Sequence, residues 1–177
     1  MTIELRRYQH DGLPEGFRQL MLDVHDDAYA DRRHEPFVQR WSWFLDRWSS
    51  KPGFVCVVAF DGAEPVGFTY GAPMADGAEW WRPFVEPAPA RTATFAVSEL
   101  MLRPRWRGQG VSQQLHEALL DGRPEALAVL SVDTARPKVQ ALYESWSYRK
   151  VGEEQPFEDS PLYAIMLRDL GTETERS

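Results

Sequence analysis

The segment between residues 94 and 132 constrains the fold most, because it joins two apolar strands through a helix. Residues 94–102 and 126–132 are apolar runs of strand length, and residues 109–121 carry apolar side chains at helical spacing before Gly122. Two strands linked through a helix pair in one sheet as parallel neighbours with a right-handed crossover. The segment therefore predicts an α/β fold that contains a parallel pair of strands.

Sequence patterns on either side of this segment predict the remaining elements. Periodic apolar residues predict helices, alternating or continuous apolar runs predict strands, and proline and glycine mark their ends. In chain order these elements are a strand at 2–8, a helix opening at Pro14, a second helix with Phe37, Trp41, Phe44, Leu45 and Trp48 on one stripe, a hairpin of strands 54–60 and 65–71 turning at Asp61-Gly62, a helix opening at Pro137, and strands at 148–152 and 162–168. The order β-α-α-β-β-β-α-β-α-β-β predicts a mixed sheet of about seven strands with helices on both faces.

The length of the chain predicts one domain. A chain of 177 residues can bury one sizeable core but is too short for two full domains. We expect this domain over residues 1–170, followed by a polar tail over residues 171–177. The connection over residues 72–92 is long for a compact domain, and connections of this length are often functional.

Composition and charge argue against several classes of protein. The chain has 20 basic and 27 acidic residues, a net charge of −7, whereas nucleic-acid-binding proteins usually carry an excess of positive charge. No apolar run is long enough for a membrane-spanning helix, and no secretory signal is visible. Cys56 is the single cysteine, which excludes an internal disulfide and a cysteine-rich zinc site. We therefore expect a cytoplasmic protein, and the preference for arginine over lysine is typical of a GC-rich bacterial genome.

The turn between the strand at 94–102 and the following helix is the segment that indicates chemistry. Gly108 and Gly110 allow the backbone to approach a ligand, and the first turn of the helix offers unpaired N–H groups at the positive end of its dipole. Arg103, Arg105 and Arg107 add three positive charges to an otherwise acidic chain. Together these features indicate a site for a diphosphate or another polyanion.

Three interpretations of this turn stay open. A dinucleotide site would need a third glycine where the chain has Gln113. Its glycine motif would also follow the strand directly, whereas here five residues separate Leu102 from Gly108. In favour of this site, Asp133 lies at a suitable distance for the acidic residue that binds the ribose. A Walker-type phosphate loop is excluded, because no Gly-Lys-Ser/Thr follows. The simplest alternative is a solvent-exposed turn with surface arginines, and the third interpretation is a coenzyme A site.

The coenzyme A interpretation comes from a resemblance to the GNAT superfamily of acyl-CoA N-acyltransferases. The superfamily signature Q/R-x-x-G-x-G/A is matched by Arg105-Trp106-Arg107-Gly108-Gln109-Gly110. The lead-in Glu99–Pro104 is similar to the fourth strand of that superfamily, and Ala141-Leu142-Tyr143 matches a later segment. The resemblance covers most of residues 2–168 and implies a GNAT-like fold. Two positions depart from the family pattern: Arg136 replaces a frequent asparagine, and Trp146-Ser147-Tyr148 replaces Leu-Gly-Phe.

The resemblance implies acetyl-CoA, or another acyl-CoA, as the donor. A metal site formed by His25, His34 and nearby carboxylates would have no recognised ligand spacing, and we expect no metal. In the superfamily the donor diphosphate binds backbone amides of the glycine turn and the helix start, and strand backbone faces the thioester. The residues carried over to donor binding are Leu100, Leu102, Arg103, Arg105, Arg107, Gly108, Gln109, Gly110, Val111, Ser112 and Arg136. The side chain of Val111 is expected in the core, and the side chains of Leu100 and Leu102 are expected to pack.

The resemblance also implies catalytic roles for three residues. Tyr143 matches the general acid that protonates the departing thiolate, and a phenol suits this task as a proton donor. Glu99 is the carboxylate on the strand beside the thioester, either as general base, as an anchor for the substrate, or in a structural pair. Ser98 matches a position that several members use, and a serine there would act through a water relay.

The acceptor is expected to be a small-molecule amine or a peptide amine. Acidic residues between the two N-terminal helices would attract a protonated amine, or they form a solvated loop. These residues are Asp26, Asp27, Asp31 and Glu35, with His25, Tyr29 and His34 between them. Trp80, Trp81 and Phe84 would either cap an apolar acceptor or bury their connection on the sheet. We further expect Cys56 to be buried and His116 to face solvent.

The principal alternative to an acetyltransferase is a GNAT-like domain that senses acyl-CoA without turnover. The departures at Arg136 and Ser147 favour this alternative. We expect no nucleic-acid or membrane partner. The sequence leaves the choice between a monomer and a homodimer open.

Overall fold

The computed structural model describes residues 1–171. The polar tail is predicted over residues 171–177, and all of it except residue 171 lies outside the described residues. The chain divides into two units, which are treated separately below. Unit 1 comprises Met1–Ala72 and Ser98–Gly122, and unit 2 comprises Pro73–Val97 and the chain from Arg123 on. The single domain over residues 1–170 stays a prediction.

Within residues 1–171, seven strands are hydrogen-bonded in the order β1-β2-β3-β4-β5-β7-β6, which confirms the predicted mixed sheet. The elements are β1 (Ile3–Gln9), α1 (Phe17–Ala28), η1 (Ala30–Arg32), α2 (Pro36–Gln39), α3 (Trp41–Ser49), β2 (Val55–Asp61), β3 (Glu64–Pro73), η2 (Arg82–Phe84), β4 (Thr94–Leu102), η3 (Pro104–Trp106), α4 (Val111–Leu120), β5 (Leu127–Asp133), α5 (Pro137–Ser145), β6 (Arg149–Glu154) and β7 (Tyr163–Asp169). Strand β4 runs from unit 2 into unit 1.

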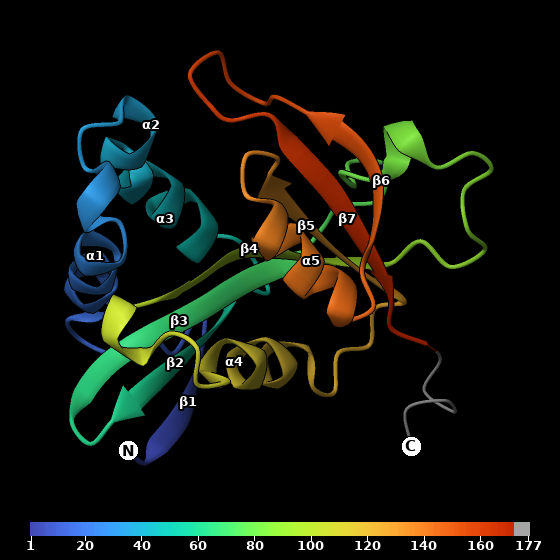
Figure 1. Cartoon of the computed structure of the whole chain (residues 1–177). Helices are drawn as coiled ribbons and strands as arrows, with labels where there is room; N and C mark the ends of the chain where they lie inside the picture. The colour runs from blue at the N-terminus through green and yellow to red at the C-terminus, as the bar shows by residue number, and fades with distance from the viewer. Residues whose placement is uncertain (172–177) are drawn as a thin grey trace. The chain divides into compact units, whose positions relative to one another are not determined.

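The core of unit 1 lies between helices α1 and α3 and one face of strands β2 and β3. Strand β1 pairs antiparallel with β2, and β2 pairs antiparallel with β3, as the hairpin signal at Asp61-Gly62 predicts for the second pair. Alternate residues of β2, namely Cys56, Val58 and Phe60, belong to this core. Helix α4 contacts β1 and β2, and Figure 1 shows it on the side of these strands opposite α1 and α3. Helices therefore cover both faces of the strands in this unit, as predicted.

Two sequence expectations in unit 1 are wrong. The predicted second helix is broken at Arg40, whose backbone (φ −99°, ψ 18°) leaves the helical region between α2 and α3. The break lets Trp41 enter the core, while Phe37 and Phe44 pack on each other at 5.4 Å between ring centroids. The second error concerns His116, which is fully buried rather than facing solvent, because it lies on the face of α4 that also buries Leu119 and Leu120.

Unit 2 contains the predicted parallel pair of strands. Residues Thr94–Ala96 of β4 pair in parallel with Leu127–Val129 of β5. Strand β7 is antiparallel to both β5 and β6. The prediction of a parallel connection through a helix is therefore confirmed.

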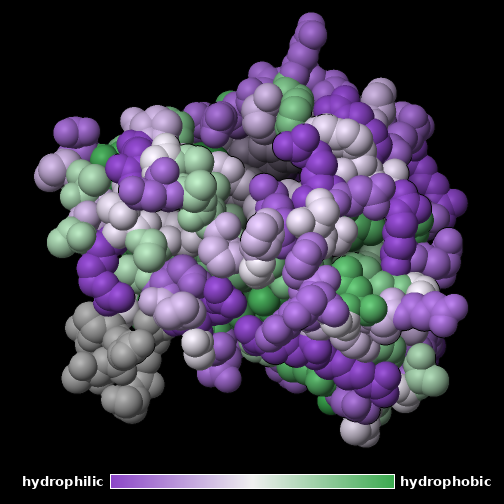
Figure 2. Space-filling model, turned by 180° about the vertical axis from the view of Figure 1, so that it is seen from behind, coloured by the Kyte–Doolittle hydropathy of each residue, from purple (hydrophilic) through white to green (hydrophobic). Residues whose placement is uncertain are grey.

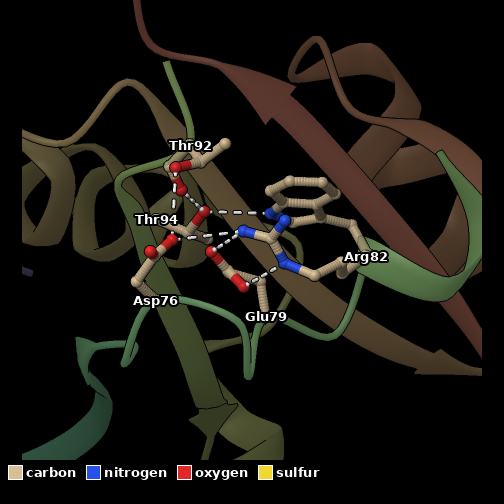
Figure 3. Close-up of polar contacts among 6 residues, drawn as sticks. Asp76, Glu79, Arg82, Thr92 and Thr94 are labelled. Atoms are coloured by element: carbon tan, nitrogen blue, oxygen red, sulfur yellow. Dashed lines mark hydrogen bonds and ion pairs between the residues drawn. The ribbon is translucent and has the colours of Figure 1, made fainter. Parts of the chain in front are cut away.

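The long connection between β3 and β4 is fixed inside unit 2 by buried contacts rather than left as an open loop. Trp81 is fully buried, and its indole N–H donates to the hydroxyl of Thr94 at 2.9 Å. The carboxylate of Glu79 is buried and accepts two hydrogen bonds of 2.8 Å from Arg82 (Figure 3). Arg82 also reaches Asp76 at 3.2 Å. Of the two roles predicted for the aromatic residues here, burial of the connection is the one that Trp81 performs.

Hydrophilic side chains cover most of the face shown in Figure 2. Within the part of the chain that the structure describes, no helix has the length and apolar character needed to cross a membrane.

Candidate active site

The glycine turn of unit 1 forms an open cradle at the start of helix α4. Gly108 (φ 75°) and Gly110 (φ 80°) both adopt the left-handed conformation that favours glycine. A Cβ atom added at either position would meet no atom within 4 Å, so the space above the turn is open. Gly110 caps α4 without a side-chain hydrogen bond, and the first N–H groups of a helix have no partner within it. This arrangement suits an anion that approaches the backbone.

The three arginines of the turn have different surroundings. Arg103 donates to the backbone oxygen of Pro65 at 2.8 Å and pairs with Asp27 at 3.3 Å. Arg107 is exposed and donates to the backbone oxygen of Ala28, the last residue of α1, at 2.9 Å. Arg105 is exposed and lies over the Trp106 ring, 4.9 Å from its centroid. Arg103 and Arg107 therefore tie the turn to the end of α1.

The remaining backbone of the turn is held by two further contacts. The indole N–H of Trp106 donates to Asp61 at 3.0 Å, and the side-chain amide of Gln109 donates to the backbone oxygen of Arg105 at 3.2 Å. Val111 is fully buried, as predicted, while Ser112 is partly buried. The turn is thus fixed by hydrogen bonds from its own side chains.

Glu99 lies on the part of β4 that belongs to unit 1 and has an unusual environment. The indole N–H of Trp41 donates to its carboxylate at 3.3 Å, and the hydroxyl of Thr69 donates to its backbone oxygen at 2.7 Å. The residue as a whole is only partly buried, but its carboxyl group is desolvated. Burial raises the pKa of Glu99 from 4.5 to about 7, although the Trp41 hydrogen bond acts in the opposite direction. A carboxyl group with such a pKa can accept a proton near neutral pH.

The neighbours of Glu99 on β4 include both partly buried and buried residues. Ser98 and Leu100 are partly buried. Leu102 is buried against β3, since a Cβ atom at Gly67 would lie 2.3 Å from its side chain. The backbone N–H after Leu102, that of Arg103, donates to Val66 of β3 at 2.8 Å. The expected packing role of the Leu102 side chain is therefore confirmed.

Tyr143 belongs to unit 2 and lies in an aromatic cluster at the end of helix α5. It is buried, and its ring makes edge contacts with Trp146 at 5.3 Å and Tyr148 at 5.7 Å between centroids. Arg136 lies at the start of the same helix and is exposed. The role of Tyr143 as a general acid and that of Arg136 in donor binding stay predictions.

The departure from the family pattern at Ser147 has a structural explanation. Ser147 is the non-glycine residue with a left-handed backbone among the described residues, at φ 72°. Its N–H donates to Glu144 and the N–H of Tyr148 donates to Tyr143, each at 3.1 Å, which together form a Schellman motif. Glycine is the usual residue at this position of the motif, so Ser147 adopts the left-handed backbone at some cost in strain.

Two of the four acidic residues predicted to attract an amine are paired with arginine side chains in unit 1. Asp27 pairs with Arg103 at 3.3 Å, and Glu35 pairs with Arg32 at 2.8 Å. Asp26 is exposed and lies 3.7 Å from the imidazole of His25. Within residues 1–171, no group of three or more histidine, cysteine, aspartate or glutamate side chains could hold a metal ion. The connection is therefore a weaker attractant for an amine than its sequence indicates.

The sequence did not identify the residues that surround Glu99. Trp41 lies on the apolar stripe of its predicted helix, which indicated only a core residue. Tyr70 is fully buried on β3, and its hydroxyl is the buried side-chain polar atom without a hydrogen bond among the described residues. Nothing in the spacing of these residues along the chain indicates that they meet at Glu99.

The family model of the acetyltransferase (GNAT) family matches residues 17–148, and the chain therefore belongs to this family. Comparison with curated proteins gives no significant match. Among solved structures, Arabidopsis thaliana NAA60 in complex with acetyl-CoA is similar with a TM-score of 0.71 at 15% identity, covering 96% of this chain and 99% of that one.

Two further structures are similar over almost their whole length. Escherichia coli ElaA has a TM-score of 0.69 at 16% identity, covering 95% of this chain and 100% of that one. The PaiA N-acetyltransferase from Thermoplasma acidophilum, in complex with coenzyme A, has a TM-score of 0.63 at 15% identity, covering 96% and 99%. At such identities the likeness concerns the fold, and it confirms the predicted GNAT-like architecture.

Proposed function

We propose that this protein is an N-acetyltransferase that transfers the acetyl group of acetyl-CoA to a primary amine of a small molecule or a peptide. The observation that carries the proposal is the open glycine turn at the start of α4. Gly108 and Gly110 have left-handed backbones with free space above them, and the helix that follows has no side-chain cap. A diphosphate is the ligand that such a turn suits best.

The donor diphosphate would bind the amides from Arg107 to Ser112. Arg105 and Arg107 are exposed beside these amides and would add positive charge without occupying the cradle. The backbone of Leu100 and Leu102 on β4 would face the thioester, where an N–H group can stabilise the oxyanion of the tetrahedral intermediate. Arg136 would contribute to donor binding from α5.

The transfer would be a direct attack in a ternary complex. Glu99 takes a proton from the acceptor ammonium, directly or through a water next to Ser98, and the freed amine attacks the thioester carbonyl carbon. The carbon–sulfur bond then breaks, Tyr143 donates a proton to the departing thiolate, and the nitrogen of the new amide releases its second proton to solvent or to the tyrosinate. The pKa of Glu99, raised by burial to about 7, matches the first task, because half of the carboxyl groups are ionised near neutral pH.

A melting scan combined with an assay of thiol release tests the proposal. Acetyl-CoA should raise the melting temperature, since a ligand at a hundredfold excess over Kd stabilises the native state by about 2.7 kcal/mol. A panel of primary amines should include at least one that releases free thiol from acetyl-CoA. A shift with NAD and none with acetyl-CoA would contradict the proposal in favour of a dinucleotide site. Acetyl-CoA binding without thiol release from any amine would instead indicate the sensor.

A further inference from the structure

The carboxylate of Glu99 has one side-chain donor in unit 1, and this donor is an indole rather than a basic group. The N–H of Trp41 on α3 lies 3.3 Å from Glu99 Oε1. Within residues 1–171, no ion pair involves Glu99. Thr69 of β3 donates to the backbone oxygen of Glu99 and not to its carboxylate. The orientation of the carboxylate therefore depends on where the indole is held.

The indole of Trp41 is fixed by a stack of two aromatic rings at the C-terminal end of α1. Its ring lies parallel to the imidazole of His25, at 4.4 Å between centroids and an interplanar angle of 5°. The other neighbour of His25 in the stack is Tyr29, at 4.9 Å and 26°. Phe68 of β3 contacts Trp41 at 5.8 Å, and Trp41 is only 5% exposed. These contacts leave the indole N–H little freedom to turn away from Glu99.

Several titratable groups lie close to this pair. The Tyr70 hydroxyl on β3 interacts electrostatically with Glu99, and burial holds its pKa well above 10. Cys56 on β2 lies beside Tyr70, and burial likewise raises the pKa of its thiol. Both groups are therefore neutral in the range where Glu99 titrates. The pKa of His25 on α1 is lowered by burial, with Asp26 acting in the opposite direction, so His25 loses its proton at lower pH than Glu99.

We propose that Trp41 is the positioning residue of Glu99: the stacked indole aims the carboxylate and stabilises its ionised form through the N–H hydrogen bond. The inference rests on the proposed function for the step that Glu99 performs. It assigns no contact with substrate to Trp41, which acts through Glu99. A hydrogen bond to a carboxylate favours the charged form, whereas burial disfavours it, and Trp41 supplies the donor that opposes burial here.

The first test compares pH profiles of kcat/KM for thiol release. Trp41→Phe keeps an aromatic ring against His25 but removes the donor, so the acid limb should move to higher pH by about one unit. Trp43→Phe is the matched control, because Trp43 lies on the same helix and is 47% exposed. The control should keep the wild-type limb. A folded Trp41→Phe protein with an unmoved acid limb would overturn the proposal.

The second test needs neither turnover nor a folded Trp41 variant. The indole ¹H–¹⁵N resonance of Trp41 should shift with pH in the wild type, with a midpoint near that of Glu99. In Glu99→Gln this step should vanish, which leaves only the step of His25 at lower pH. A Trp41 resonance that does not respond between pH 6 and about 8 in the wild type, or responds equally in Glu99→Gln, would overturn the proposal. If no amine supports turnover, the proposed function fails, but this titration still shows whether Trp41 is hydrogen-bonded to the Glu99 carboxylate.

Discussion

Gly16 and Gly110 have the same backbone conformation at the N-caps of two helices in unit 1. Gly16 precedes α1 with φ 79° and ψ 2°, and Gly110 precedes α4 with φ 80° and ψ 3°. Neither would place an added Cβ atom within 4 Å of another atom, and neither supplies a side-chain cap. The two glycines differ in that only Gly110 belongs to the sequence signature of the family. They therefore form a matched pair for separating backbone strain from ligand binding.

We predict that Gly110→Asp abolishes donor binding while the protein stays folded. The substitution places a carboxylate where the donor diphosphate is proposed to lie, and it costs about 1 kcal/mol of strain at a left-handed position. Gly16→Asp should cost a similar free energy of unfolding and leave acetyl-CoA affinity intact. Calorimetric titration with acetyl-CoA and melting curves of both variants check this. Donor binding retained by folded Gly110→Asp would place the diphosphate elsewhere.

Glu99 should make the free energy of unfolding depend on pH. Its pKa is about 7 in the folded chain and near 4.5 in the unfolded chain, so the folded state holds the proton more tightly. The resulting stabilisation is fully present below pH 4.5 and is lost as the pH rises through 7. Relative to Glu99→Gln, the wild type should lose up to about 3 kcal/mol over this range. Urea unfolding of both proteins between these pH values measures the difference.

A second buried carboxylate supplies a control of opposite sign. The pKa of Glu79 is lowered by its hydrogen bonds with Arg82, so its contribution to stability is present at neutral pH and is lost as the pH falls through its folded value. The stability of the wild type relative to Glu79→Gln should therefore fall as the pH falls, whereas its stability relative to Glu99→Gln should fall as the pH rises toward neutral. Equal pH slopes for the wild type and Glu99→Gln would show that the Glu99 carboxyl is solvated.

The fold could be predicted from the sequence where a local pattern decides the structure. The strand at Thr94–Leu102 and the parallel pairing with β5 follow from an apolar run, a helix and a second apolar run. The glycine turn could be predicted for the same reason, because Gly108 and Gly110 are needed for left-handed backbone. In each case the determining residues are close together in the chain.

The parts that could not be predicted depend on contacts between distant residues. Trp41 and Glu99 are far apart in the sequence, and only the packing of α3 on the sheet of unit 1 brings the indole to the carboxylate. The break at Arg40 and the burial of His116 also differ from what the apolar spacing of their helices predicts, because packing in the folded chain decides both. The arginines of the turn indicated an anion site by their charge, but Arg103 is instead held by Asp27.

Ser147→Gly should stabilise the protein. Ser147 has φ 72° in the Schellman motif that ends α5, and a left-handed conformation costs a residue with a Cβ atom about 1–2 kcal/mol. Part of this gain is offset by the larger backbone entropy of glycine in the unfolded chain, so the net increase should be about 0.5 kcal/mol. Ser147→Ala is the control, because it keeps the Cβ atom and removes only the hydroxyl. A loss of stability in Ser147→Gly but none in Ser147→Ala would disprove strain at this position.

Tyr143→Phe tests the proposed general acid and separates it from a packing role. The variant keeps the ring in its cluster with Trp146 and Tyr148 but removes the proton, and positioned acid catalysis is worth about 10²–10⁴-fold in rate. Turnover should fall by about that factor, whereas donor affinity should change little, because the hydroxyl would act mainly in the transition state. Tyr148→Phe is a matched control, since it removes the hydroxyl of a second buried tyrosine in the same cluster and should leave turnover unchanged.

A packing role for Tyr143 predicts a different result: a loss of stability on the order of 1 kcal/mol in Tyr143→Phe with turnover intact. Thiol release, donor affinity and melting temperature measured for the three proteins distinguish these outcomes, and wild-type turnover in Tyr143→Phe would remove this residue from the mechanism.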